Sequence, residues 1–69
     1  MFLVVDAGNS RIKAGLYEAG ELSEFKVFKD FKEFKTWARR AKWERGAYAS
    51  VVPELFSPLS KMGLVPLTW

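Results

Sequence analysis

The chain has 69 residues, of which 49% are hydrophobic and 28% charged, so it is unlike disordered chains and long enough for one small core. It contains neither Cys nor His, which excludes disulfides, metal centres built on those residues and a histidine general base. The net charge of +3 is only a weak sign of phosphate or nucleic-acid binding, because both signs are interspersed along the chain. Any chemistry must therefore depend on Asp, Glu, Ser, Lys, Arg or backbone amides.

The first apolar run, from Phe2 to Val5, ends at Asp6. It is far shorter than the roughly 20 residues that span a membrane. It also lacks the basic start and the longer apolar segment of a secretory signal. We therefore expect a cytoplasmic protein without membrane association.

Three strands are predicted in the first part of the chain. Residues 1–5 are continuously apolar, which is typical of a central strand that is buried on both faces. Turn-forming residues at 7–10 lead to an alternating segment at 12–17, and a second turn at 18–21 leads to another at 23–28. These segments predict a three-stranded antiparallel meander.

A helix is predicted over residues 30–43, where apolar residues recur at helical spacing. Asp30 is placed to cap its start, with Glu33 completing a capping box, and Gly46 is expected to close the segment. The helix is rich in basic and aromatic residues, which is also typical of nucleic-acid binding. Because Phe31, Phe34 and Trp37 fall on one stripe, the spacing favours a role in the core.

The remaining elements are predicted to be a strand, a short helix and a last strand. The strand covers residues 47–52 and ends at Pro53, and the helix begins at Ser57-Pro58 and ends at Gly63. The last strand covers residues 64–69, at an edge of the sheet or at a bulge, because Pro66 has no amide hydrogen. The sequence thus predicts a single α/β unit over residues 1–69 with one mixed sheet. No helix follows to cover the second side of that sheet, so we expect a fragment or a domain completed by another copy.

The turn after the first strand is the sharpest candidate for a site. Gly8 allows an anion to approach the backbone, and Asn9 and Ser10 add side-chain donors. Asp6 is suited to hold a hydrated Mg²⁺ together with phosphate oxygens, and Lys13 adds positive charge. The same residue types also form ordinary tight turns, so local chemistry alone leaves both interpretations open.

Two segments carry a resemblance to a known family. The run V-V-D-A-G-N-S-R-I-K-A-G-L-Y, residues 4–17, resembles the first phosphate motif, D-x-G-N-T, of type III pantothenate kinases, members of the actin-like ATPase superfamily. The run A-S-V-V-P, residues 49–53, is similar to the segment that ends the fourth strand in that family. Ser10 stands where the family usually has Thr, which keeps the hydroxyl, and Arg11 replaces a small or polar residue.

The resemblance covers all 69 residues and implies the opening part of the N-terminal lobe of a two-lobed kinase, with a ribonuclease H-like (actin-like ATPase) fold and the second lobe absent. It implies transfer of the ATP γ-phosphoryl group to pantothenate, in coenzyme A biosynthesis, with Mg²⁺ and a monovalent cation (potassium or ammonium), and a homodimer. It assigns the metal to Asp6. The residues that it assigns to nucleotide and phosphate are Asp6, Gly8, Asn9, Ser10 and Lys13.

The family's G-A-D-R-like motif, whose Asp is the catalytic base, has no counterpart in these residues. We therefore assign no catalytic residue and expect the 69-residue chain to be inactive in isolation. The alternative is a transcriptional accessory or nucleic-acid-associated regulatory protein, because the same family has carried the description Bvg accessory factor. A dimerising fragment with no ligand is a third interpretation.

Overall fold

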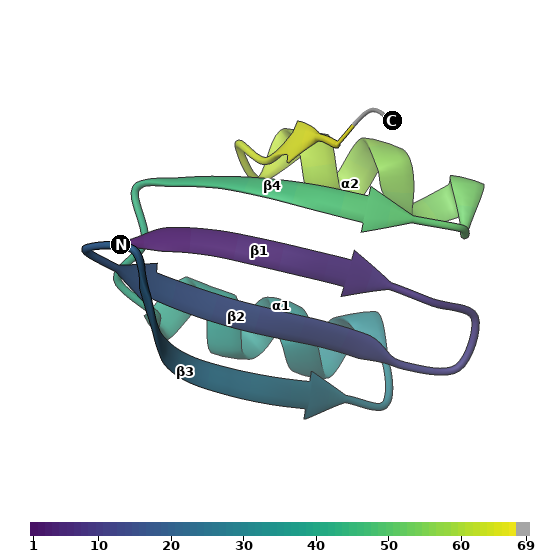
Figure 1. Ribbon diagram of the computed structural model, residues 1–69. Coiled ribbons are helices and arrows are strands. Elements are labelled where there is room, and N and C mark those ends of the chain that lie inside the picture. The colour runs from purple at the N-terminus through teal and green to yellow at the C-terminus, as the bar shows by residue number, and fades with distance from the viewer. Residues whose placement is uncertain (68–69) are drawn as a thin grey trace.

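The computed structural model describes residues 1–67, which form one five-stranded sheet with two helices on the same side of it (Figure 1). The elements in chain order are β1 (Phe2–Ala7), β2 (Ile12–Glu18), β3 (Glu21–Phe28), α1 (Phe31–Arg40), β4 (Arg45–Ser50), a 3₁₀ turn η1 (Pro53–Leu55), α2 (Phe56–Lys61) and β5 (Val65–Pro66). The α/β class and the predicted order of elements are confirmed.

The sheet has the strand order β3-β2-β1-β4-β5. The first three strands are antiparallel neighbours, which confirms the meander, and β4 and β5 join it in parallel on the other side of β1. β1 is therefore the central strand, as predicted. The parallel pairing places the carboxyl ends of β1 and β4 at the same edge of the sheet.

Helix α1 begins where the sequence predicts. The Asp30 side chain accepts a hydrogen bond of 2.8 Å from the Glu33 amide, as an N-cap should. The prediction that the helix extends to Trp43 is wrong, since it ends at Arg40. Trp43 instead folds back, and its indole Nε1 donates to the Ala38 carbonyl at 3.0 Å, which satisfies an acceptor of the last turn.

Gly46 does not end the helical segment, contrary to prediction, but lies inside β4. Its missing side chain has a packing reason. A Cβ at this position would stand 2.5 Å from the Leu3 carbonyl oxygen and 2.5 Å from a methyl group of Leu64. The glycine therefore allows the strand and the segment after α2 to pack closely.

Helix α2 begins at Phe56, two residues before Pro58, the predicted first helical position, because η1 runs directly into it. Its N-cap position is held by Leu55 and not by Ser57. Its end is as predicted: Gly63 has φ of +99°, and the Gly63 and Leu64 amides donate to the carbonyls of Ser60 (3.0 Å) and Leu59 (3.4 Å). The last strand is an edge strand that contains Pro66, as predicted. The predicted range 64–69 is too long, because Leu64 and Leu67 lie outside the strand, and residues 68–69 lie outside the described residues.

The core lies between the helices and one face of the sheet. Its fully buried side chains come from the central strand and from both helices: Phe34, Leu3, Leu59 and Val5. Phe28 at the end of β3 packs edge-on against Phe34 with ring centroids 5.8 Å apart, and its ring lies 5.3 Å from that of Trp37. The aromatic stripe of α1 is therefore part of the core, as its spacing predicted.

The opposite face of the sheet is not covered by either helix (Figure 1). In β1 the residues Leu3, Val5 and Ala7 are buried on the helix side, whereas Phe2 and Asp6 are exposed. The prediction of a central strand buried on both faces is therefore wrong within the described residues. We call this uncovered surface the open face and the other the helix face.

Candidate functional site

Asp6 lies near the carboxyl end of β1, and its side chain is on the open face. It is exposed to solvent, as a carboxylate that binds a ligand must be. Lys13 on β2 is its direct cross-strand partner and is also exposed. The hairpin thus brings together a carboxylate and an ammonium group that are seven positions apart in the chain.

The turn that joins β1 to β2 carries the other predicted residues. Asn9 and Ser10 are exposed at its tip. The Gly8 amide donates to the Arg11 carbonyl at 2.9 Å, so this N–H is used within the turn. A Cβ on Gly8 would meet nothing nearer than that carbonyl oxygen, at 3.5 Å, and the turn does not itself require a glycine here. The free donors at the tip are therefore those of Asn9 and Ser10.

The end of β4 lies directly beside this hairpin. Asp6 is paired with Ala49 and Ala7 with Ser50, and the Val51 amide extends the pairing with a 3.1 Å hydrogen bond to the Ala7 carbonyl. Two sequence segments about 40 positions apart therefore meet at one edge of the sheet. In open α/β sheets, ligands bind beyond the carboxyl ends of the strands.

Ser50 has a local structural role at this edge. Its hydroxyl donates to the Val52 carbonyl and accepts from the Val52 amide, both at 3.0 Å. These bonds fix the path of the chain as it leaves β4. They also occupy the hydroxyl, so Ser50 is not presented as a free nucleophile.

A small hollow lies on the open face next to Asp6. Its volume is about 150 Å³, and its lining residues include Asp6, Lys13, Gly15, Tyr17 and Phe25. A Cβ on Gly15 would lie 3.2 Å from the Leu22 side chain and 3.3 Å from the Tyr17 ring, so these two side chains pack closely over the glycine. The sequence prediction missed Tyr17 and Phe25, although the alternation of β2 places Lys13, Gly15 and Tyr17 on one face.

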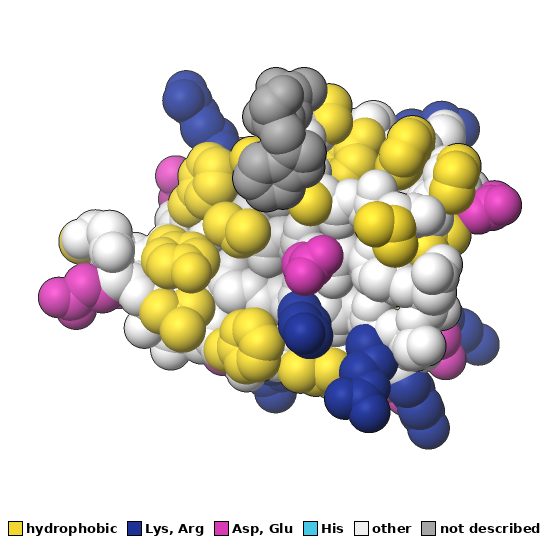
Figure 2. Space-filling model, turned by 45° about the vertical axis from the view of Figure 1, so that its right-hand side comes forward, with side chains coloured by type: hydrophobic (Ala, Val, Ile, Leu, Met, Phe, Trp, Pro, Cys, Tyr) yellow, Lys and Arg dark blue, Asp and Glu magenta, His cyan; other side chains and the backbone are white. Residues whose placement is uncertain are grey.

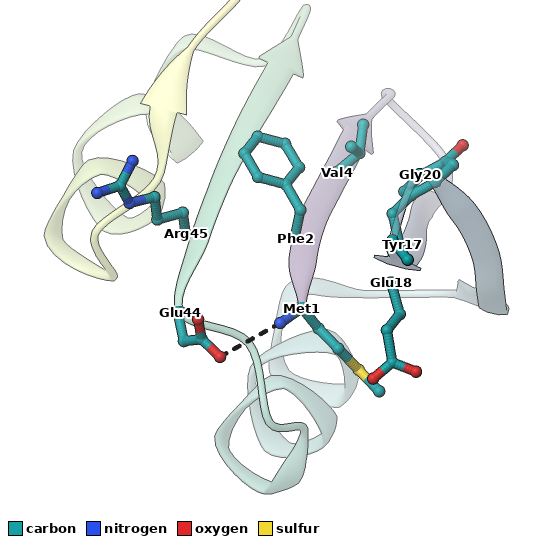
Figure 3. A pocket seen from close by; sticks show the side chains of 9 residues that line it. Met1, Phe2, Val4, Tyr17, Glu18, Gly20, Glu44 and Arg45 are labelled. Carbon is teal, nitrogen blue, oxygen red and sulfur yellow. Dashed lines mark hydrogen bonds and ion pairs between the residues drawn. The ribbon is translucent and has the colours of Figure 1, made fainter.

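A larger hollow of about 570 Å³ lies at the other end of β1 (Figure 3). Phe2, Tyr17 and Arg45 help to line it, and the terminal ammonium of Met1 forms an ion pair of 3.3 Å with Glu44 beside it. None of the predicted site residues lines this hollow. Tyr17 lines both this hollow and the smaller one next to Asp6.

Residues 1–67 bring no three carboxylate-type or other common metal ligands together. Asp6 alone does not make a metal site. A single exposed carboxylate does fit Mg²⁺ that keeps several waters and takes its other ligands from phosphate groups. The residues present are thus compatible with Mg²⁺ that arrives with a nucleotide.

The aromatic residues of α1 are engaged in packing. Phe34 is fully buried and Trp37 packs partly buried against the core, while Trp43 is tied to the helix end by its indole nitrogen. Base stacking requires an exposed ring face. The basic side chains of α1, such as Lys32 and Arg39, are exposed on its outer side.

None of the helices within residues 1–67 has the length and apolar character needed to cross a membrane. The chain matches no protein-family model, and it matches no curated protein.

Proposed function

We propose that this chain is the opening, nucleotide-binding part of a type III pantothenate kinase, in which a ribonuclease H-like lobe helps to transfer the ATP γ-phosphoryl group to pantothenate. The order of elements supports this proposal. A three-stranded meander followed by helix, strand, helix and strand in one mixed sheet is what the resemblance implies for the start of such a lobe.

The observation that carries the proposal is the meeting of the two family-like segments. The turn after Asp6 and the strand end at Ser50 are neighbours at the carboxyl edge of the parallel pair β1 and β4. The local secondary structure of residues 6–10 and 49–53 does not require the two segments to be adjacent. A phosphate-binding site built from both segments does require their adjacency, because phosphoryl transfer depends on groups that are held in fixed positions.

Each residue then has a role that fits its surroundings. Asn9 and Ser10 donate to phosphate oxygens from the exposed tip of the turn, and Lys13 supplies positive charge. Asp6 would hold the hydrated Mg²⁺ that accompanies the nucleotide, and the ion would supply neutralisation of charge on the phosphate groups. The Gly8 amide contributes only if the turn opens its hydrogen bond to Arg11.

No residue of the candidate site is assigned as a general base. Asp6 is committed to the metal in this proposal, and the Ser50 hydroxyl is bonded to Val52. We therefore expect the 69-residue chain to bind the nucleotide without phosphorylating pantothenate. A magnesium-dependent phosphopantothenate signal from the pure chain would contradict this expectation.

Calorimetric titration of the chain with ATP, with and without Mg²⁺, tests the proposal. Asp6→Asn removes the charge on the open face and should weaken magnesium-dependent binding by about tenfold or more, the value of one hydrogen bond to a charged group. Asp30→Asn is the matched control, because asparagine also caps helices and Asp30 lies outside the site. Absence of magnesium-dependent binding, or equal losses in both variants, would refute the proposal.

The nucleic-acid alternative has a different signature. Binding to DNA that falls steeply with salt, and that is lost in Lys32→Glu but kept in Asp6→Asn, would favour a regulatory protein. Under the kinase proposal, Asp6→Asn instead weakens magnesium-dependent nucleotide binding and Lys32→Glu does not.

A further inference from the structure

A hollow of about 650 Å³ lies along α1, beside the end of β3. Its apolar lining residues are Phe28 and Trp37, whose ring centroids are 5.3 Å apart. Along one side it is lined by Lys32, Thr36 and Arg40, which are exposed and follow each other at intervals of four positions, on one stripe of the helix. A volume of this size is within the range of pockets that bind ligands.

The hollow carries a surplus of positive charge. Within residues 1–67, neither Lys32 nor Arg40 forms an ion pair. The carboxylates at the hollow are already engaged, because Asp30 accepts from the Glu33 amide at 2.8 Å and Glu33 pairs with Lys29 at 3.8 Å. On the open face, by contrast, hydrophobic side chains predominate with a few charged ones among them (Figure 2). The hollow thus combines apolar rings with two cations that have no partner there.

The spacing of these groups matches an extended peptide. Lys32 and Arg40 are eight positions apart on α1, which corresponds to about 12 Å along the helix axis. Trp37 lies between them along the helix. In an extended chain, the side chains of residues i, i+2 and i+4 point to the same side and span about 13 Å. An apolar residue between two acidic ones at these positions therefore matches the order cation, ring, cation.

We infer that this hollow binds an extended acidic segment of a partner protein, in which an apolar residue lies between two acidic residues. The apolar side chain packs against Phe28 and Trp37, and the two carboxylates pair with Lys32 and Arg40. The Thr36 hydroxyl donates to the Lys32 carbonyl at 3.0 Å, so its oxygen can still accept from an amide of the segment. The inference does not rest on the proposed function, because no residue of the candidate site lines this hollow.

Nucleic acid fits the hollow less well than a peptide. Base stacking requires an exposed ring face, whereas Trp37 is half-buried and packs against Phe28 and Phe34. Asp30 and Glu33 also line the hollow, and their charges repel a continuous phosphate backbone. A segment with only two acidic side chains, which are set apart from each other, can avoid these carboxylates.

Calorimetric titration of the 69-residue chain with short peptides tests the inference, at about 0.15 M salt to screen distant charges. The peptide S-E-S-F-S-E-S, with acetyl and amide ends, should bind with a dissociation constant of about 1 mM or below. The isomer S-E-E-S-S-F-S has the same composition and charge but another spacing, and should bind about threefold more weakly or worse. The peptide S-K-S-F-S-K-S reverses both charges and should not bind.

Paired variants of α1 supply the second measurement. Lys32→Gln combined with Arg40→Gln should weaken binding of S-E-S-F-S-E-S by about tenfold, the combined value of two exposed ion pairs. Lys35→Gln combined with Arg39→Gln is the matched control, because it removes the same charges from exposed positions of α1 that do not line the hollow. It should leave the dissociation constant within about twofold of the wild-type value. Glutamine is a good helix former, and circular dichroism verifies that both variants are folded.

The inference is overturned if S-E-S-F-S-E-S does not bind, if its isomer binds equally well, or if the two double variants have equal effects. Single-stranded DNA that binds more tightly than the peptide, and that is lost with Lys32→Gln and Arg40→Gln, overturns it in favour of nucleic acid. Magnesium-dependent nucleotide binding should be the same in both double variants and in the wild-type chain. The peptide site and the proposed function can therefore fail separately.

Discussion

The two faces of the sheet are built from the same strands and differ in almost every physical respect. In β1, Leu3 and Val5 have no exposed surface on the helix face, whereas Phe2 on the open face is 42% exposed. Successive side chains of a strand point to opposite sides, so this contrast arises between adjacent residues. An apolar run in the sequence therefore indicates a strand with apolar side chains on both faces. It does not indicate which part of the protein covers each face.

The largest effect is expected from truncating matched rings on the two faces. Phe34→Ala on α1 removes a fully buried ring and should lower the free energy of unfolding by about 3–5 kcal/mol, a large part of the stability of a small domain. Phe25→Ala on the open face should cost less than about 1 kcal/mol in the monomer. Urea titrations followed by circular dichroism at low protein concentration measure both. Equal losses would mean that the faces do not differ as described.

The next effect concerns two glycines in neighbouring parts of the sheet. Gly46→Ala places a methyl group against the Leu3 backbone carbonyl on the helix face and should cost about 1–3 kcal/mol or more. The methyl group of Gly15→Ala on the open face would come closest to the Leu22 and Tyr17 side chains, at 3.2 and 3.3 Å, and would make an ordinary contact of 3.9 Å with the Glu24 carbonyl oxygen. Those side chains can move into solvent, so its cost should stay below about 1 kcal/mol. A larger loss for Gly15→Ala than for Gly46→Ala would contradict this account.

A smaller effect is expected at the start of α1, the helix that covers much of the helix face. Asp30→Ala removes the acceptor for the Glu33 amide and should cost about 1 kcal/mol. Asp30→Asn keeps an acceptor at the same position and should be nearly neutral. Thermal unfolding of the two variants and of the wild-type chain measures the difference in melting temperature. An equal decrease for both variants would show that the hydrogen bond of the cap does not stabilise the helix.

Much of the fold follows from signals that are local in the sequence. The alternation in β2, the cap at Asp30 and the helix end at Gly63 each involve residues close together in the chain. The predicted end of α1 at Trp43 is wrong because apolar residues continue beyond Arg40, at Ala41 and Trp43. Trp43 is apolar because it folds back onto Ala38, and a helical period does not encode that contact.

The candidate site was less accessible to prediction from local patterns. Residues 6–10 have the composition of any turn, and their proximity to Ser50 depends on the parallel pairing of β1 with β4 across the intervening helix. Local patterns also do not predict the role of Gly46, because its small size is required by contacts with Leu3 and Leu64, which are distant in the sequence. The resemblance supplied the two segments, and their adjacency is a property of the fold.

The outermost strand β3 bears on how the chain avoids uncontrolled growth into fibrils. It is the long edge of the sheet, and between its apolar residues it exposes Glu24 and Lys26, which form an ion pair of 3.6 Å. Charges on an edge disfavour the addition of further strands, while Pro66 blunts the opposite edge. Lateral strand-by-strand polymerisation is thus discouraged at both margins of the sheet.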